Sequence, residues 1–198
     1  MTAIPLPDTY KTINRLSLIL LLITYIAFIN LGLADTMRDV AFPYIRSTFS
    51  KPLEASGLVL LAGTIGYMIA SFSSGQVVTW LGIGRMLALS VTLRAIGLAG
   101  FALAPTWEIL LLVSVIIGLG GGLLDSGANI YVAANYGATP MFWLHAAFGI
   151  GATVGPLMMT GLIERLDQTW NVGYVVASGL HIGLLVIFIF TLKYWSTS

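Results

Sequence analysis

The chain has 198 residues, of which 58% are hydrophobic and 9% are charged, whereas soluble domains carry about 25% charged residues. This composition excludes a water-soluble fold and predicts an integral membrane protein. Its nine basic and eight acidic side chains, two histidines and no cysteine exclude a basic surface for nucleic acid, disulfide bonds and a zinc site of ordinary ligand number, so we expect no metal, no cofactor and no nucleic-acid partner.

Six apolar segments follow one another, each close to the roughly 20 residues that a helix needs to cross a bilayer. Their residues do not alternate between apolar and polar, as the strands of a membrane barrel would. We therefore predict an all-α membrane protein with a transmembrane domain over residues 16–194, preceded by a segment 1–15 and followed by a tail 195–198. Charges, prolines and turn residues place the six spans at 16–35, 57–80, 86–103, 108–136, 141–163 and 172–192.

The first span carries no charge from Leu16 to Ala34. That run is longer than the roughly 7–15 apolar residues of a signal peptide, so we expect a retained span. At its end, Asp35, Arg38 and Asp39 stand at positions i, i+3 and i+4 of one helical face. The cluster is interpreted either as a gate for a cation or substrate or as a solvated helix end, followed by a loop over residues 38–54.

Arg94 in the third span and Asp125 in the fourth are charges at membrane depth, where each costs about 2.5–3.5 kcal/mol on insertion scales. At 1.5 Å per residue they lie about 14 Å and 15 Å from the same side of the membrane. The matching depth suggests two alternatives. Either Asp125 couples to a proton or cation while Arg94 modulates its pKa, or the two form a permanent structural ion pair. Asn129, one turn beyond Asp125, adds a hydrogen-bonding group on the same face.

Small residues recur at four-residue spacing within the spans, which lets helix backbones approach closely in lipid. His145 and His181 are expected to be hydrogen-bonded packing residues rather than titrating relays. Tyrosines within the spans could line a sugar site, although ordinary packing is the more common role. The small residues are Gly63, Gly66, Ala70, Gly118, Gly122, Gly151 and Gly155, and the tyrosines are Tyr25, Tyr67 and Tyr131.

The segment from Gly75 to Arg85, GQVVTWLGIGR, resembles the loop signature between the second and third helices of the major facilitator superfamily. Gly75, Gly82 and Arg85 match the signature as residues of a conformational loop, whereas Thr79 and Trp80 replace its Asp-Arg pair.

Three longer segments are similar to the branch of that superfamily that contains the fucose-proton symporter and the sodium-dependent glucose transporters. They are GLADTMRD at 32–39, GLGGGLLDSGAN at 118–129 and LHAAFGIGATVGP at 144–156. The resemblance implies that Asp39 and Asp125 are the coupling and sugar-binding acids, with Asn129 beside them. Together with Asp35 and Arg94 they form the predicted substrate and ion site.

The same resemblance implies the amino-terminal half of a major facilitator fold, with six helices as a 3+3 inverted repeat. We expect a half of a secondary transporter for a sugar-like or other small polar solute, coupled to a proton or sodium. It would act as a parallel homodimer or with a complementary six-helix half, in the lipid bilayer of the cytoplasmic membrane with both termini in the cytoplasm.

Two other functions are open. The altered Thr79-Trp80 pair and the single half also suit a membrane scaffold or assembly subunit of a larger complex, without transport. An intramembrane serine protease, suggested by Ser126-Gly127 and His181, is the weaker alternative. Leu124-Asp125 occupies the place of its Gly-x pair, and no histidine in the second span could stabilise an oxyanion. We therefore expect that the protein is not an enzyme.

Overall fold

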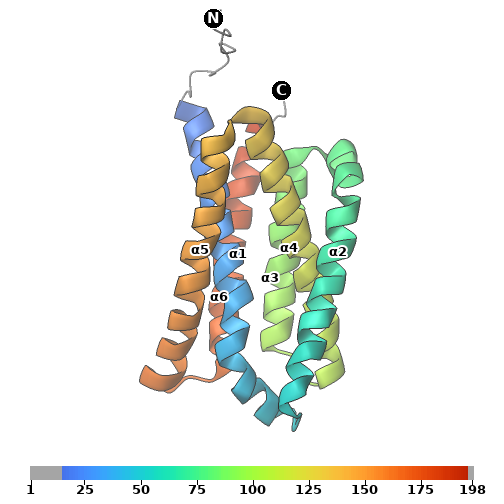
Figure 1. Ribbon diagram of the computed structural model, residues 1–198, viewed down its shortest axis with the longest axis vertical. Helices are drawn as coiled ribbons and strands as arrows, with labels where there is room; N and C mark the ends of the chain where they lie inside the picture. Colours follow the sequence, from blue (N-terminus) through green and yellow to red (C-terminus); the bar gives the residue numbers. More distant parts are fainter. Residues whose placement is uncertain (1–14, 196–198) are drawn as a thin grey trace, which may run out of the picture.

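The computed structural model describes residues 15–195, and that part of the chain is a bundle of six long helices (Figure 1). All six are long and apolar enough to cross a membrane, which confirms the predicted class. The helices are α1 Arg15–Thr48, α2 Ser56–Leu81, α3 Ile83–Ala102, α4 Trp107–Asn135, α5 Ala138–Thr160 and α6 Trp170–Thr191. Short turns of other helix types occupy Leu53–Ala55, Gly161–Arg165 and Leu192–Tyr194.

Helix α1 is longer than the sequence prediction, because it continues through Pro43 to Thr48 where a loop was expected. Its added turns bury Met37, Ala41 and Ile45, each fully inaccessible to solvent. These residues are four positions apart, so they lie on one face and dock into the bundle. The charges that begin at Asp35 therefore do not mark the end of the helix.

The packing of the helices repeats between the first three and the last three. The contact between α1 and α5 corresponds to the contact between α4 and α2. The contact between α3 and α4 corresponds to the contact between α6 and α1. Helices α3 and α6 also pack on each other. Exchanging α1, α2 and α3 for α4, α5 and α6 thus maps the two contacts in each of the first two pairs onto each other and the α3–α6 contact onto itself. This pattern agrees with the predicted 3+3 repeat.

Glycines bring the backbones together at the two equivalent crossings. A Cβ atom on Gly118 of α4 would overlap the backbone carbonyl of Gly63 on α2, and one on Gly151 of α5 would overlap the carbonyl of Ile29 on α1. The predicted close approach of small residues is therefore confirmed at both crossings.

Candidate functional site

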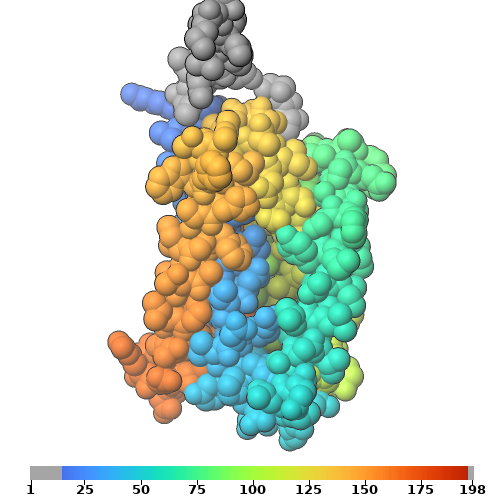
Figure 2. All heavy atoms as spheres, in the orientation of Figure 1, coloured from blue at the N-terminus to red at the C-terminus, as the bar shows by residue number. Residues whose placement is uncertain are grey.

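The bundle is hollowed on the face between α1 and α2, where α4 forms the floor of a furrow (Figure 2). Two cavities of about 250 and 260 Å³ open there, and both are bordered by Asp35 and Tyr67. We call the first the Tyr174 cavity, the second the Asp125 cavity, and both together the vestibule. The Asp125 cavity is lined by residues of α1, α2, α4 and α5, and the Tyr174 cavity by residues of α1, α2, α3, α4 and α6.

Arg94 is buried on α3, with 1% of its side chain exposed, and borders the Tyr174 cavity. Its Nη2 donates to Asp35 Oδ1 at 2.8 Å and to the Leu31 carbonyl at 3.4 Å, both on α1. Its Nε donates to His181 Nε2 on α6 at 3.1 Å. Because His181 Nδ1 lies 2.8 Å from the Ala177 carbonyl, Nδ1 carries the proton and the ring is neutral. Arg94 therefore joins α1, α3 and α6.

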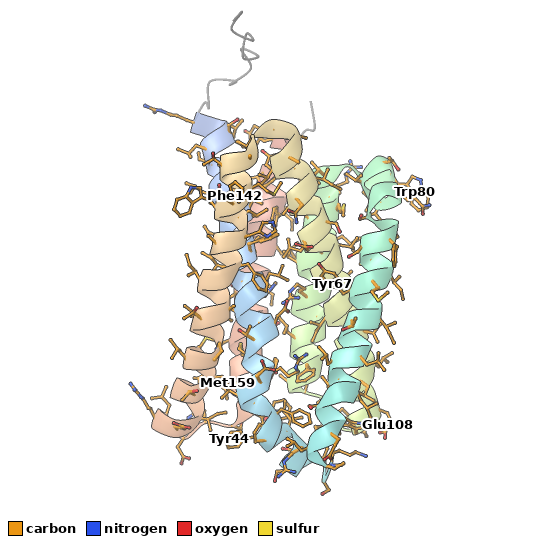
Figure 3. The ribbon with its side chains drawn as sticks, in the orientation of Figure 1. Tyr44, Tyr67, Trp80, Glu108, Phe142 and Met159 are labelled. Atoms are coloured by element: carbon orange, nitrogen blue, oxygen red, sulfur yellow. The ribbon has the colours of Figure 1, made fainter. Side chains whose placement is uncertain are left out.

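Asp125 is half-buried on α4 and is held by polar groups of α2 and of its own helix. The Tyr67 hydroxyl donates to Oδ2 at 2.5 Å, and Asn129 Nδ2 donates to Oδ1 at 3.0 Å. Figure 3 shows Tyr67 on the side of α2 that faces α1 and α4. Asn129 also donates to the Asp125 backbone carbonyl at 2.8 Å. The carboxylate thus faces the vestibule with two hydrogen-bond donors in place.

The ion pair between Arg94 and Asp125, one of the two alternatives open from the sequence, does not form. The carboxylate that Arg94 contacts is Asp35, at 2.8 Å, while Asp125 contacts Tyr67 and Asn129. Depth along a helix fixes the height of a side chain but leaves its direction around the helix axis open. The carboxylate on the side of α3 to which Arg94 points is that of Asp35 on α1.

The three charges at Asp35, Arg38 and Asp39 divide between two environments. Asp35 is 40% exposed and borders both cavities. Asp39 is 73% exposed, pairs with Arg38 at 3.5 Å and does not border the vestibule, which Arg38 does. The gate interpretation therefore fits the position of Asp35 and the solvated interpretation that of Asp39.

The residues of the expected conformational loop lie almost entirely in helices. Gly75 is inside α2 and Arg85 is exposed in the first turn of α3, so that Gly82 alone connects the two helices. Gly82 has φ +75°, a conformation that glycine adopts without strain. Trp80 is 77% exposed at the end of α2 and points away from the bundle (Figure 3).

Two titratable side chains of the vestibule carried no site prediction from sequence. Tyr174 of α6 lines the cavity named after it, and His145 of α5, expected to pack, borders the Asp125 cavity. Tyr174 lies seven positions before His181 and hence on the same helical face, a spacing that could have linked them. Tyr25 and Tyr131 lie outside the vestibule and donate or share hydrogen bonds with Pro140 and Tyr136.

The arrangement of His181 does not support the serine protease alternative, in which this histidine would act as the general base for Ser126. Both ring nitrogens of His181 are engaged, Nδ1 with the Ala177 carbonyl and Nε2 with Arg94. Neither nitrogen is free to take a proton from Ser126.

Comparison with known proteins gives the same family as the sequence motifs. A sequence profile described as Major Facilitator Superfamily matches residues 21–196. Sodium-dependent glucose transporter 1 of Homo sapiens is 25% identical over 135 residues, covering 67% of this chain and 26% of that protein. The glucose/mannose transporter GlcP of Bacillus subtilis (strain 168) is 23% identical over 142 residues, covering 71% of this chain and 35% of GlcP.

A similar match extends to sodium-dependent glucose transporter 1A of Mus musculus, 23% identical over 137 residues, or 68% of this chain and 32% of the mouse protein. The chain thus spans about a quarter to a third of the length of these relatives. The profile match covers nearly the whole six-helix bundle. The chain belongs to the Major Facilitator Superfamily.

Proposed function

We propose that this chain is one half of a secondary transporter that moves a sugar-like or other small polar solute together with a proton or a sodium ion. The observation that carries the proposal is Asp125, a half-buried carboxylate that faces the vestibule from a membrane-spanning helix. Ionisable groups at membrane depth are costly and mark ion or substrate pathways.

Coupling is assigned to Asp125 because its contacts differ from those of Asp35. Asp35 contacts the buried Arg94, which compensates its charge. Asp125 contacts the neutral groups of Tyr67 and Asn129, and no salt bridge joins it to any residue in the range 15–195. A proton or a sodium ion arriving from the vestibule would neutralise it.

The solute class is supported by the relatives, whose names specify glucose and mannose. The vestibule offers what such solutes need: aromatic rings from Phe28, Tyr67 and Phe148 and a carboxylate from Asp125 in one cavity. Sugars present both hydroxyl groups and an apolar ring face, and these residues can contact both.

A second six-helix unit is needed to close the vestibule, because the furrow is open along one face of this bundle (Figure 2). Helix α1 begins and α6 ends on the same side of the bundle (Figure 1). Two copies can therefore be related by an axis along the membrane normal, as the halves of the family are. We propose a parallel homodimer, or a pair with a complementary half, with both termini in the cytoplasm.

Uptake of D-glucose into proteoliposomes tests this function. Wild type should accumulate the sugar when a proton or sodium gradient is imposed. Asp125→Asn should lose accumulation and retain exchange of labelled for unlabelled sugar, because the neutral amide no longer responds to the ion. Glu164→Gln, at an exposed position outside the vestibule, is the matched control and should behave as wild type. Equal accumulation by Asp125→Asn and wild type would contradict the assignment of coupling to Asp125.

The scaffold alternative is favoured by one observation, the pair Thr79 and Trp80 at the position of the charged loop residues. Neither side chain carries a charge, so these positions cannot form the charge contacts of the family signature. If the wild-type chain shows no uptake and copurifies in stoichiometric amounts with a larger membrane complex, the scaffold function replaces transport.

A further inference from the structure

Tyr67 of α2 is fixed against α4 by its backbone. A Cβ atom on Gly118 of α4 would come too close to the Tyr67 backbone nitrogen, and one on Gly122 would overlap the Tyr67 carbonyl. Gly118 and Gly122 are one turn apart on the same face of α4, so the backbone of Tyr67 lies between them. The Tyr67 side chain is 38% exposed, and it is the part of the residue that can change position.

The phenol of Tyr67 connects the two cavities to Asp125. Its side chain borders both the Tyr174 cavity and the Asp125 cavity, and its hydroxyl donates to Asp125 Oδ2 at 2.5 Å. The other hydrogen-bond donor to this carboxylate among residues 15–195 is Asn129, on the same helix as Asp125. Tyr67 therefore supplies the hydrogen bond that joins the carboxylate to another helix (Figure 3).

The charged and titratable groups around Asp125 do not bond to its carboxylate. Asp35 of α1 and His145 of α5 border the same cavity. Nη1 of Arg94 on α3 would lie 3.0 Å from a Cβ on Gly121, which is one turn before Asp125, and Arg94 is paired with Asp35. None of these groups forms a hydrogen bond or a salt bridge with Asp125 in the described part of the chain. The charge of the carboxylate is therefore stabilised by its two neutral donors.

Binding of a coupling ion takes away the acceptor of the Tyr67 hydroxyl. A hydrogen bond to a carboxylate is roughly twice as strong as one to a neutral acceptor. A proton that binds Asp125 Oδ2 converts the carboxylate into a neutral carboxyl group, and a sodium ion occupies the lone pairs that accept the hydroxyl. In both cases Tyr67 keeps its own proton and loses its charged acceptor. The Tyr67 hydroxyl and the ion thus compete for the same carboxylate.

We propose that Tyr67 is a positioning residue that sets how tightly Asp125 binds the coupling ion. Its hydroxyl weakens ion binding, which allows the ion to leave the site again in each transport cycle. Because the same side chain borders both cavities, an ion at Asp125 frees the phenol at their boundary. The inference rests on the proposed transport function and adds the residue through which α2 responds to the ion.

The ion dependence of uptake by Tyr67→Phe in proteoliposomes tests this role. D-glucose is the solute, and the external concentration of the ion that drives uptake by wild type, proton or sodium, is varied at constant membrane potential. The variant should need about tenfold less ion for half-maximal uptake, the effect of losing one hydrogen bond to a charged group. The KM for D-glucose at saturating ion should stay close to that of wild type, because the phenylalanine ring fills the same space.

Replacing Tyr67 by 3-fluorotyrosine should give the opposite change while keeping the ring and its hydroxyl. Fluorine makes the phenol more acidic and therefore a stronger hydrogen-bond donor to the carboxylate. The ion concentration for half-maximal uptake should rise above that of wild type. This replacement keeps the inference open to contradiction even if Tyr67→Phe does not fold.

Tyr25→Phe is the matched control. The Tyr25 hydroxyl of α1 donates to the Pro140 carbonyl of α5 at 3.0 Å, outside the vestibule. This hydrogen bond also joins two helices, but its acceptor is uncharged. Its removal should lower the melting temperature and leave the ion dependence of uptake unchanged.

The proposed function fails separately from the role of Tyr67 in this design. If wild type accumulates D-glucose and either Tyr67 replacement keeps the wild-type ion dependence, the role of Tyr67 is wrong and transport stands. A change of equal size in Tyr25→Phe would also overturn the role, because the shift would then follow from helix packing. If wild type shows no ion-driven accumulation, the transport function fails and the role of Tyr67 fails with it.

Discussion

Arg94 places a charge inside the bundle, and every hydrogen bond that it makes reaches another helix. Asp35 and the Leu31 carbonyl belong to α1, and His181 belongs to α6. Removing one partner of a buried ion pair leaves the other charge uncompensated, and this costs more than the pair contributes when intact. Arg94 therefore links the packing of α1, α3 and α6 to the polar side chains that line the vestibule.

Asp35→Asn should destabilise the protein by about 1.5 kcal/mol, the lower end of the range for a charge-assisted hydrogen bond, because Asp35 is 40% exposed. Asp39→Asn, one turn along the same helix, should leave stability unchanged, since its exposed pair with Arg38 at 3.5 Å is weak. Thermal unfolding in detergent, followed by tryptophan fluorescence, measures both. Equal losses in the two variants would show that Arg94 is not compensated by Asp35.

At the residue scale, the sequence predicts which side chains matter better than it predicts their partners. The sequence identifies Arg94 and Asp125 because placing a charged side chain at membrane depth costs free energy. Both residues border the vestibule. The ion pair between them, one of the two alternatives open from the sequence, does not form, because helical position gives depth without direction. The contacts of Arg94 with His181 and Asp35 join residues 87 and 59 positions apart, and no local pattern specifies such contacts.

At the scale of the elements, the two glycine crossings determine how closely α2 approaches α4 and α1 approaches α5. Gly118 meets the backbone of Gly63, and Gly151 meets that of Ile29. The same α4 that carries Gly118 also carries Asp125, so the crossing sets the distance from Asp125 to Tyr67 on α2. Packing at the crossing and the geometry of the site are therefore linked.

Gly118→Ala should destabilise the bundle by about 1–3 kcal/mol, the usual cost of overpacking, because the new Cβ would overlap the Gly63 carbonyl. Gly179→Ala on α6 is the matched control, since nothing lies within 4 Å of a Cβ there, and it should be neutral. Unfolding by increasing denaturing detergent measures the two. A neutral Gly118→Ala variant would mean that α2 and α4 are not in close contact.

The helices themselves are well predicted, because long apolar runs in a membrane leave few alternatives to a helix. The spacing of Gly118 and Gly151 with their neighbours also predicts the crossings. The extension of α1 to Thr48 lies outside the predicted span, because the charges at Asp35 and Arg38 resemble a helix end. Apolar residues at four-residue spacing, Met37, Ala41 and Ile45, continue beyond those charges and carry the signal for the longer helix.

At the scale of the whole molecule, the bundle is one repeat-built unit with an open furrow. Asp35, Tyr67 and Asp125 lie in that furrow, where a second unit would cover them. The relatives are three to four times the length of the segment that matches here. The proposed function therefore requires that two six-helix units meet across the vestibule before a solute can be enclosed.

Counting the chains in each particle of the purified protein in lipid vesicles, by single-molecule photobleaching of a fluorescent label, tests this requirement most directly. The proposed function predicts two six-helix units per particle, seen as two bleaching steps for a homodimer or as one step with an equimolar second chain on a gel. Particles that contain a single copy and no second chain, yet still accumulate D-glucose, would contradict it.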